Sequence, residues 1–260
     1  MKRIVSIIKV GGNLISNEEI LNKFLSDFAQ LEGLKVLVHG GGKLATELAT
    51  KLGIETKMID GRRITDAETL DVITMVYGGL VNKTIVAKLQ AHNCNAVGIS
   101  GADLNSIQSV KRPLKEYDFG FVGDVVKVNS SMFSLLLNNN ISPVCCAITH
   151  DNNGQLFNTN ADTIASEIAV GLSNDFETHL YYCFEKNGVL KDINDENSVI
   201  KKINSASYQK LLEDKIIADG MLPKLHNCFN ALNKKVSQVH IGSINMLHKN
   251  NTLKTTITLK

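Results

Sequence analysis

Two glycine-rich turns, each directly after a short apolar run, are the features of this sequence best suited to chemistry. Residues 4–10 form a β-branched run that ends in Gly11-Gly12, and residues 34–38 lead through His39 into Gly40-Gly41-Gly42. A turn between a buried strand and a helix leaves backbone N–H groups unpaired, where the helix dipole also favours negative charge. Each turn could bind a phosphate or a carboxylate, although each alone is also typical of a plain strand–helix connection.

Charged and polar side chains accompany these turns. Lys9 ends the first apolar run, where a cation could neutralise a phosphoryl group in transfer; the alternative is a solvated lysine at a strand end. Arg63, beside Arg62, could hold a carboxylate with two parallel hydrogen bonds, and a surface arginine is the alternative. His39 ends an apolar strand, so we expect a core histidine bonded to backbone, without a catalytic role. The segment 158–162 reads Asn-Thr-Asn-Ala-Asp and leads into a helix, so it could supply an N-cap, but capping alone does not explain so polar a cluster.

Neither turn carries a familiar nucleotide-binding fingerprint. Residues 9–13 do not fit GxxxxGK[ST], and residues 39–43 do not fit GxGxxG, which disfavours P-loop enzymes and Rossmann dehydrogenases. Adjacent parallel strands would place both turns at the same carboxyl edge of a sheet, where ligands of α/β folds bind. Two such turns side by side suggest two anionic ligands.

Strands and helices alternate along the chain, which predicts an α/β fold with a mostly parallel central sheet. Apolar runs predict strands at 4–10, 34–38, 96–99, 141–148, 180–184 and 239–241. Helical spacing predicts helices at 20–31, 44–52, 65–85, 162–172, 205–213 and 220–232, with capping boxes at Ser16 with Glu19 and at Thr65 with Glu68. Residues 106–128 contain a proline and two glycines among β-prone pieces, which predicts a hairpin insertion bordering a site.

Composition limits the possible partners. Lys plus Arg number 28 against 26 Asp plus Glu in 260 residues, a net charge of +2, so no binding of nucleic acid or of an anionic membrane is expected. The five cysteines lack CxxC spacing, which argues against a disulfide framework and a zinc site. The N-terminal apolar run is too short for a signal peptide or a spanning helix. We expect a cytoplasmic protein without a metal site of its own.

Five segments, in order along almost the whole chain, resemble the acetylglutamate kinases of the amino acid kinase family. They are Ile-Ile-Lys-Val-Gly-Gly (7–12), His-Gly-Gly-Gly (39–42), Asp-Gly-Arg-Arg-Ile-Thr (60–65), Asn-Thr-Asn-Ala-Asp (158–162) and Asp-Gly-Met-Leu-Pro-Lys (219–224). The resemblance implies an open three-layer αβα sandwich in two lobes, with residues 1–172 binding an N-acylated glutamate and 173–260 binding the nucleotide. It also implies that ATP phosphorylates the γ-carboxylate of N-acetyl-L-glutamate or N-succinyl-L-glutamate, a step in arginine biosynthesis.

The resemblance assigns roles to individual residues. Lys9 and Lys224 would stabilise the transferring phosphoryl group, and Asp162 would orient both lysines. Arg63 would pair with the α-carboxylate of the substrate, and Asn158 would bond its α-substituents. Backbone N–H groups for phosphate and substrate oxygens would come from Gly11, Gly12, Gly41 and Gly42. Mg²⁺ would arrive on the ATP rather than in a protein cage, consistent with a sequence that does not cluster carboxylates.

The chain departs from the family pattern on both sides of the expected site. On the nucleotide side, residues 183–187 read Cys-Phe-Glu-Lys-Asn where relatives usually carry Ser or Thr followed by Asp, and residues 254–257 lack the usual Gly-Thr pair. Nucleotide contacts there are expected to differ. On the glutamate side, the hairpin at 106–128 should border the acyl group, and Lys111, Arg112 or Lys115 could pair with the extra carboxylate of a succinyl group.

Assembly and two alternative functions complete these expectations. In some relatives an extra N-terminal helix links dimers into arginine-regulated hexamers. Lys9 lies so near the N-terminus that we expect no such helix here, and we therefore expect a homodimer insensitive to arginine. One alternative is a sibling kinase acting on aspartate, glutamate, carbamate or a nucleoside monophosphate, which the context of Arg63 and the 158–162 spacing disfavour. The other is a non-catalytic sensor, which the retention of Lys9, Lys224 and Asp162 disfavours.

Overall fold

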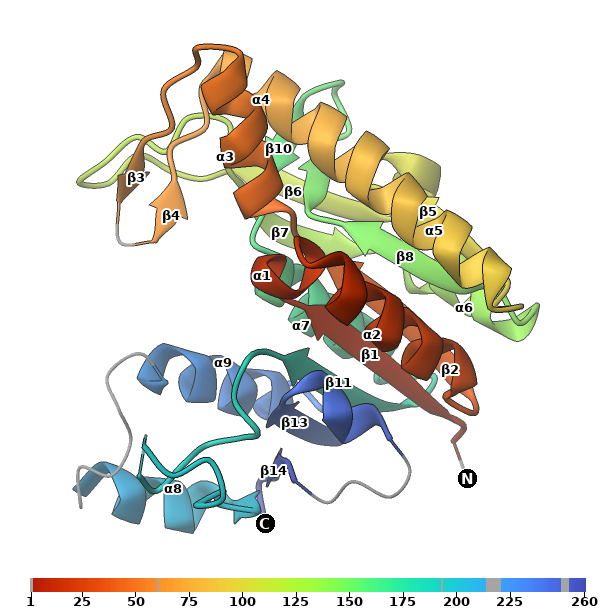
Figure 1. The fold of residues 1–260 in the computed structure, drawn as a ribbon, viewed down its shortest axis with the longest axis vertical. Coiled ribbons are helices and arrows are strands. Elements are labelled where there is room, and N and C mark those ends of the chain that lie inside the picture. The colour runs from red at the N-terminus through yellow and green to blue at the C-terminus, as the bar shows by residue number, and fades with distance from the viewer. Residues whose placement is uncertain (1, 60, 193, 214–220, 249–252) are drawn as a thin grey trace.

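The chain folds around one large sheet in a computed structural model that describes residues 2–59, 61–192, 194–213, 221–248 and 253–260 (Figure 1). The strands are β1 (Ile4–Val10), β2 (Leu34–His39), β3 (Met58–Ile59), β4 (Arg62–Arg63), β5 (Ala96–Ile99), β6 (Ile107–Lys111), β7 (Gly123–Val128), β8 (Ser142–Cys146), β9 (Ile148–His150), β10 (Leu156–Asn158), β11 (Glu177–Cys183), β12 (Lys202–Ile203), β13 (Gln238–Gly242) and β14 (Thr255–Ile257). Asp60, Asp219 and the expected helix start at Gly220 lie outside the described residues.

Helices connect these strands. They are α1 (Gly12–Ile15), α2 (Glu18–Gln30), α3 (Gly42–Lys51), α4 (Ala67–Ile73), the π-helical η1 (Thr74–Val81), α5 (Asn82–Ala91), the 3₁₀ turn η2 (Asp103–Asn105), α6 (Ser130–Asn138), α7 (Ala161–Leu172), α8 (Ser205–Glu213), α9 (Leu222–Asn233) and the 3₁₀ turn η3 (Ile244–Leu247).

The large sheet has the strand order β12-β14-β13-β11-β1-β2-β8-β5. Strands β13, β11, β1, β2, β8 and β5 pair in parallel, whereas β14 runs antiparallel to β13. The predicted, mostly parallel sheet is therefore confirmed. Val10 pairs with His39 on one side and with Cys183 on the other, so β1, β2 and β11 end at the same edge.

Helices cover both faces of this sheet. On one face α5 contacts β5, β8 and α2, and on the other α7 contacts β1, β2 and β11, α6 contacts β8 and α9 contacts β13. Figure 1 shows α2 in front of β1 and α7 behind it. Burial on both faces explains why β1 reads as an apolar run, with Val5, Ile7, Ile8 and Val10 all inaccessible to solvent. The three-layer αβα architecture expected from the resemblance is confirmed.

The predicted insertion at 106–128 is a hairpin in a second sheet. β6 and β7 pair antiparallel, and the sheet order is β10-β9-β6-β7. The turn of the hairpin reaches the start of α4, where the backbone of Thr65 bonds Phe119 and Phe121 at 3.0 and 2.7 Å. Phe121 also accepts from the backbone N–H of Asn158 at 2.9 Å. These bonds bring the hairpin to the border of the segment 158–162.

Two predicted helix caps are wrong by one residue. The backbone N–H of Ser16 closes the short helix α1, so Asn17 caps α2 instead, accepting from the N–H of Ile20 at 3.0 Å. Thr65 is committed to the hairpin, so Asp66 caps α4 by accepting from the N–H of Thr69 at 2.8 Å. In both cases the backbone of the predicted cap residue bonds a neighbouring element, so the next residue caps the helix instead.

Two further differences concern element boundaries. The strand predicted at 141–148 divides into β8 and β9, because the chain leaves the large sheet at Ala147 and joins the second one. Helix α6 was not predicted, although its buried residues Met132, Phe133 and Leu137 recur at helical spacing and Asn129 caps its first turn.

The helix predicted at 65–85 runs from Ala67 to Ala91, with η1 as its middle part. By length and composition alone it could cross a membrane, but 44% of its most apolar stretch is buried inside the protein. It contacts β5, β8 and α2, as a core helix does.

The five cysteines are buried, and their thiols are free, which agrees with the absence of a disulfide framework predicted from their spacing.

Candidate active site

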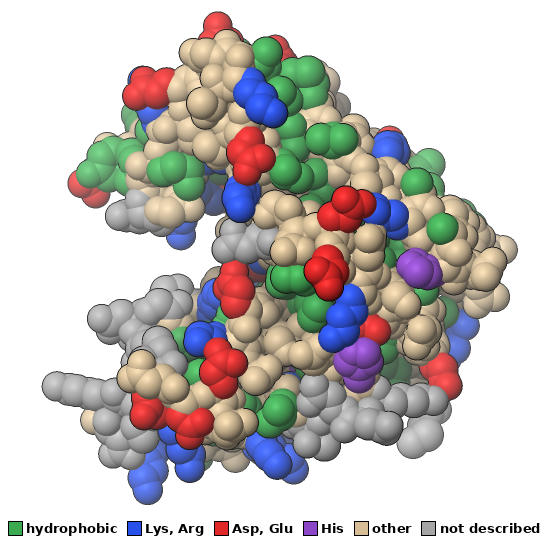
Figure 2. Space-filling model, viewed as in Figure 1, with side chains coloured by type: hydrophobic (Ala, Val, Ile, Leu, Met, Phe, Trp, Pro, Cys, Tyr) green, Lys and Arg blue, Asp and Glu red, His purple; other side chains and the backbone are tan. Residues whose placement is uncertain are grey.

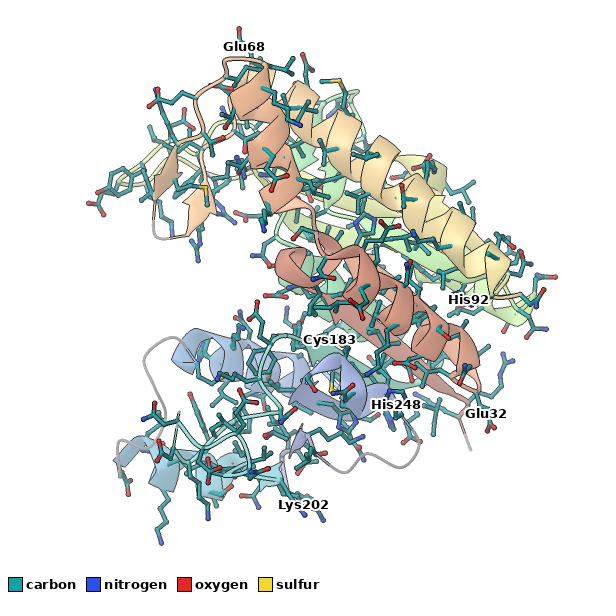
Figure 3. The ribbon with its side chains drawn as sticks, in the orientation of Figure 1. Glu32, Glu68, His92, Cys183, Lys202 and His248 are labelled. Atoms are coloured by element: carbon teal, nitrogen blue, oxygen red, sulfur yellow. The ribbon has the colours of Figure 1, made fainter. Side chains whose placement is uncertain are left out.

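The carboxyl ends of β1, β2 and β11 open into a cleft of about 580 Å³. Figure 2 shows the hollow from the side, with acidic and basic side chains around its rim. In Figure 3, Cys183 at the end of β11 lies near the middle of the molecule, whereas Glu68 and Lys202 lie at opposite ends. The cleft is lined by all the residues to which the resemblance assigns a role: Lys9, Gly11, Gly12, Gly41, Gly42, Arg63, Asn158, Asp162 and Lys224.

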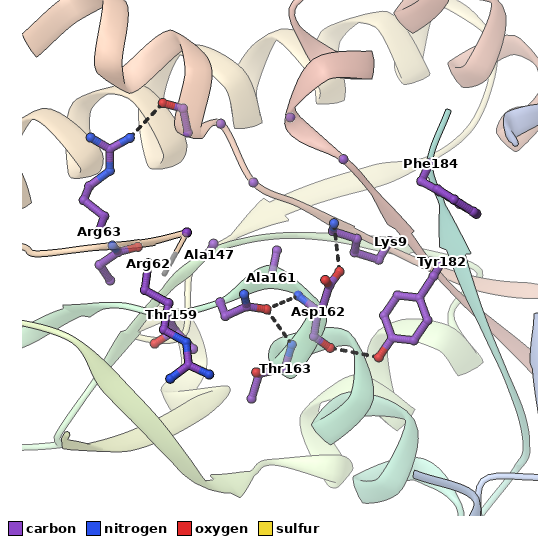
Figure 4. Close-up of a pocket in the computed structure, with 18 of the residues that line it drawn as sticks. Lys9, Arg62, Arg63, Ala147, Thr159, Ala161, Asp162, Thr163, Tyr182 and Phe184 are labelled. Carbon is purple, nitrogen blue, oxygen red and sulfur yellow. Dashed lines mark hydrogen bonds and ion pairs between the residues drawn. The ribbon is translucent and has the colours of Figure 1, made fainter. Parts of the chain in front are cut away.

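Lys9 and Asp162 form an ion pair on the floor of the cleft. Their Nζ and Oδ1 atoms are 2.8 Å apart, and the two side chains are 18% and 30% exposed. Asp162 lies in the first turn of α7, which Asn160 caps by accepting from the backbone N–H groups of that turn (Figure 4). The hydroxyl of Tyr182 donates to the backbone oxygen of Asp162 at 3.2 Å. Lys9 is therefore held by a partner, and the reading as a freely solvated lysine is wrong.

The two glycine turns lie side by side at one edge of the cleft, because the strands that carry them, β1 and β2, are neighbours in the sheet. A side chain at Gly12 would begin 3.8 Å from the backbone nitrogen of Gly42. A side chain at Gly41 would begin 2.8 Å from the ring of Tyr77, a separation that real Cβ contacts do not reach. Gly41 must therefore be glycine for the second turn to pass over Tyr77. The glycines therefore allow the two turns to pack closely against each other and against Tyr77, which a plain strand–helix connection does not require.

Arg63 joins the second glycine turn to β4. Its guanidinium donates to the carbonyl of Gly42 at 3.0 Å and to the hydroxyls of Thr46 and Thr56 at 2.7 and 3.1 Å. It is half-buried, so the reading as an ordinary surface arginine is wrong. Because a guanidinium has five N–H donors, three bonds to protein leave further donors for a ligand.

Asn158 and Arg112 line the side of the cleft nearest the hairpin. The amide of Asn158 donates to the hydroxyl of Thr65 at 3.0 Å, which fixes its orientation. Arg112 donates two hydrogen bonds to Oδ1 of Asp124, at 3.0 and 2.7 Å. Of the three cations named for the hairpin, Arg112 lines the cleft, whereas Lys111 lies over the ring of Phe121.

Lys224 comes to the cleft from the other side, in the first turn of α9. Its ammonium lies 4.7 Å from the ring centroid of Phe184. Asp162 pairs with Lys9, so an orienting role of Asp162 toward Lys224 stays a prediction.

The divergent stretch 183–187 keeps a defined backbone despite its unusual residues. Phe184 N–H donates to the carbonyl of Gly242 at 3.0 Å, and Asn187 accepts from the hydroxyl of Ser243 at 3.0 Å. Thr255, in the divergent C-terminal segment, is buried and accepts from the N–H of Val189 at 2.8 Å. The divergent C-terminal segment therefore supports the chain just after the divergent stretch 183–187.

Several residues of the cleft were not proposed from the sequence. Tyr182 lies in an apolar strand, and nothing in its spacing separates it from core residues. Asn160 could have been chosen as the cap of α7, because it precedes the first helical residue. Arg62 stands beside Arg63, and only the structure shows that both face the cleft.

His39 is the core histidine that its position predicts. Its side chain is inaccessible to solvent, with Nδ1 2.8 Å from the carbonyl of Gly40 and Nε2 3.0 Å from the amide nitrogen of Asn82. These partners require a neutral ring that donates through Nδ1 and accepts at Nε2. Burial lowers the pKa of His39 from its usual 6.5 to about 4.

His39 should therefore make the protein less stable in mild acid. Below pH 6.5 the unfolded chain gains a proton at His39 that the folded chain takes up only near pH 4. The free energy of unfolding should fall by about 3 kcal/mol across this window because of this group. Urea unfolding at pH 7 and pH 4.5 should show a smaller loss for His39→Gln than for the wild type. An equal loss in both proteins would contradict the assignment.

A sheet edge that presents glycine N–H groups, two lysines and an arginine to one cleft suits an enzyme that transfers a phosphoryl group to a small anionic acceptor. This places the protein among the small-molecule kinases of α/β fold. The chain belongs to the amino acid kinase family, whose model matches residues 5–243.

Individual relatives agree with this placement. The chain is 55% identical over 248 residues to an acetylglutamate kinase of Bacteroides fragilis, covering 95% of each sequence. It is also 55% identical over 254 residues to an acetylglutamate kinase of Cytophaga hutchinsonii, covering 96% of each. A solved structure from Streptococcus mutans, smu.665, has a TM-score of 0.76 at 26% identity and covers 100% of both chains.

Proposed function

We propose that this protein transfers the γ-phosphoryl group of ATP to the γ-carboxylate of N-acetyl-L-glutamate, a step in arginine biosynthesis. The observation that carries the proposal is the Lys9–Asp162 pair set beside the two glycine turns, with Lys224 lining the same cleft. The two relatives at 55% identity, both acetylglutamate kinases, support the choice of acceptor.

The chemistry asks for alignment and charge neutralisation rather than a general base, because a carboxylate is already a competent nucleophile at neutral pH. Lys9 and Lys224 would neutralise the phosphoryl group in transfer, with Asp162 fixing Lys9. The N–H groups of the first turn, at Gly11 and Gly12, would hold phosphate oxygens. This division of labour needs no proton transfer by the protein.

The glutamate would be held from the opposite wall. Arg63 would bind its α-carboxylate with the donors left over from its bonds to α3, and Asn158 would bond the α-substituent. The N–H groups of Gly41 and Gly42 would hold further substrate oxygens. Residues 1–172 would therefore bind the N-acylglutamate, while residues 173–260, with Lys224, would bind the nucleotide.

Mg²⁺ would enter on the nucleotide. Among the described residues no group of three or more His, Cys, Asp or Glu could hold a metal ion, although Asp162 and Glu185 line the cleft. One or two carboxylates together with phosphates suit Mg²⁺, which keeps several of its waters. When bound, the ion would supply further neutralisation of the phosphate oxygens.

N-succinyl-L-glutamate is the alternative acceptor, because Arg62 and Arg112 line the cleft in addition to Arg63. A second cation near the acyl group could pair with the extra carboxylate. Arg112 already forms an ion pair with Asp124, so the extra carboxylate of the succinyl group would have to compete with Asp124 or bind Arg62.

A coupled ADP-release assay tests the proposal. Purified protein with MgATP should turn over an N-acylated glutamate and leave free glutamate and aspartate unphosphorylated. Comparison of N-acetyl-L-glutamate with N-succinyl-L-glutamate decides the acyl group. Silence with all four compounds would reject the kinase and favour a ligand-binding sensor, the reading that the divergent stretch 183–187 suggests.

We also propose that the enzyme works as a homodimer in the cytoplasm. Met75 and Leu80, exposed apolar side chains on η1, are surface that a second copy could cover. Sedimentation that showed a hexamer, or inhibition of turnover by arginine, would contradict an arginine-insensitive dimer.

A further inference from the structure

The two lysines of the cleft are held by chemically different partners. Lys9 has a carboxylate, Asp162, at 2.8 Å, which offsets its charge. Lys224 has instead the face of an aromatic ring, with its ammonium 4.7 Å from the centroid of Phe184. That separation lies within the roughly 6 Å over which a ring attracts a cation. The ring attracts the ammonium through its quadrupole and carries no net charge.

Phe184 is a rigid support for such a contact. It directly follows β11, and its backbone N–H bonds the carbonyl of Gly242 on β13 at 3.0 Å. Its side chain is partly buried against the core. Lys224, by contrast, has an exposed side chain with a flexible four-carbon stem. The fixed ring therefore restricts where the mobile ammonium can lie.

We propose that Phe184 is a positioning residue that holds the ammonium of Lys224 in the cleft without neutralising it. The inference rests on the proposed function, since it concerns a lysine expected to meet the phosphoryl group. A carboxylate in place of the ring would hold Lys224 equally well but would cancel part of the charge that the reaction needs.

Kinetics of ring variants test this role. Phe184→Leu keeps an apolar side chain and removes the ring, so kcat should fall about 2- to 5-fold, as expected for loss of a cation–ring contact at an exposed lysine. The KM for N-acetyl-L-glutamate should stay within about twofold, because Lys224 does not hold the amino acid. Phe184→Tyr should restore kcat. The matched control is Phe176→Leu at the other end of β11, where a ring lies under Arg3, and its kcat should be unchanged.

The double variant separates positioning from general structure. If Phe184 acts through Lys224, Phe184→Leu should cost nothing further in a Lys224→Ala background. An equal loss in both backgrounds, or a Phe184→Tyr variant as slow as Phe184→Leu, would overturn the proposal.

A spectroscopic readout needs no activity. In protein labelled with ¹³C-lysine, the Hε–Cε signal of Lys224, assigned by its loss in Lys224→Ala, should be shifted upfield by the ring current of Phe184. Phe184→Leu should abolish that shift, and Phe184→Tyr should retain it. An unshifted signal in the wild type would reject the contact. If the wild type phosphorylated no N-acylglutamate, the proposed function would fail, while this signal would still decide whether Phe184 holds Lys224.

Discussion

Lys224→Ala is expected to lower kcat by about 100- to 1,000-fold, the loss typical of removing one group that stabilises charge in a transition state. Lys224 lines the cleft from α9, so its ammonium can approach the phosphoryl group in transfer. Binding of N-acetyl-L-glutamate should be preserved, because Arg63 and Asn158 lie on the opposite wall. ADP release would measure the first effect and titration calorimetry the second.

Lys234→Ala is the matched control for this prediction. Lys234 lies at the C-terminal end of the same helix and pairs with Glu167 at 3.1 Å, with 57% of its side chain exposed. An exposed pair of this kind contributes at most about 1 kcal/mol to stability, and it should leave kcat unchanged. If Lys224→Ala kept more than a tenth of wild-type kcat, the phosphoryl group would not pass near Lys224. If it abolished binding of the amino acid as well, its role would be structural.

The parts of the site that could be predicted from sequence are those fixed by local rules. An apolar run before glycines predicts a buried strand and a tight turn, and parallel pairing then brings the two turns to one edge. The register of Val10 with His39 and with Cys183 confirms this reasoning. Lys9 could be placed in the cleft for the same reason, because it stands one residue before the strand ends.

The contacts that give these residues their partners could not be predicted from sequence, because they join segments far apart along the chain. No local pattern pairs Lys9 with Asp162, or sets Phe184 under Lys224. The predictions of the two helix caps were wrong for the same reason. Thr65 has the right residue type, but its backbone is committed to a hairpin more than fifty residues away, so the neighbouring Asp66 caps α4. At each of these positions, contacts between distant segments determine the partner of the residue, and the local sequence does not.

Lys9→Met is expected to lower kcat by about 100- to 1,000-fold as well, and Asp162→Asn by a smaller factor of about 10 to 100. Lys9 would act on the phosphoryl group directly, whereas Asp162 would act by holding Lys9 in place at 2.8 Å. In Lys9→Met the carboxylate loses its partner and would face the phosphates, which adds repulsion to the loss of the cation. Steady-state ADP release at saturating substrates would measure kcat for both variants and for the double variant Lys9→Met/Asp162→Asn.

The double variant Lys9→Met/Asp162→Asn carries the sharper result. Once Lys9 is gone, Asp162 has no lysine to hold and only repels the phosphates, so its neutralisation should restore part of the activity lost in Lys9→Met. Lys88 and Glu18 offer a control ion pair, 3.1 Å apart on α5 and α2 and outside the lining of the cleft, whose single and double replacements should leave kcat unchanged. Independent losses that multiply in the Lys9–Asp162 double variant would mean that Asp162 has a task of its own, such as binding the ion carried by the nucleotide. A double variant faster than Lys9→Met would establish that the carboxylate serves the lysine.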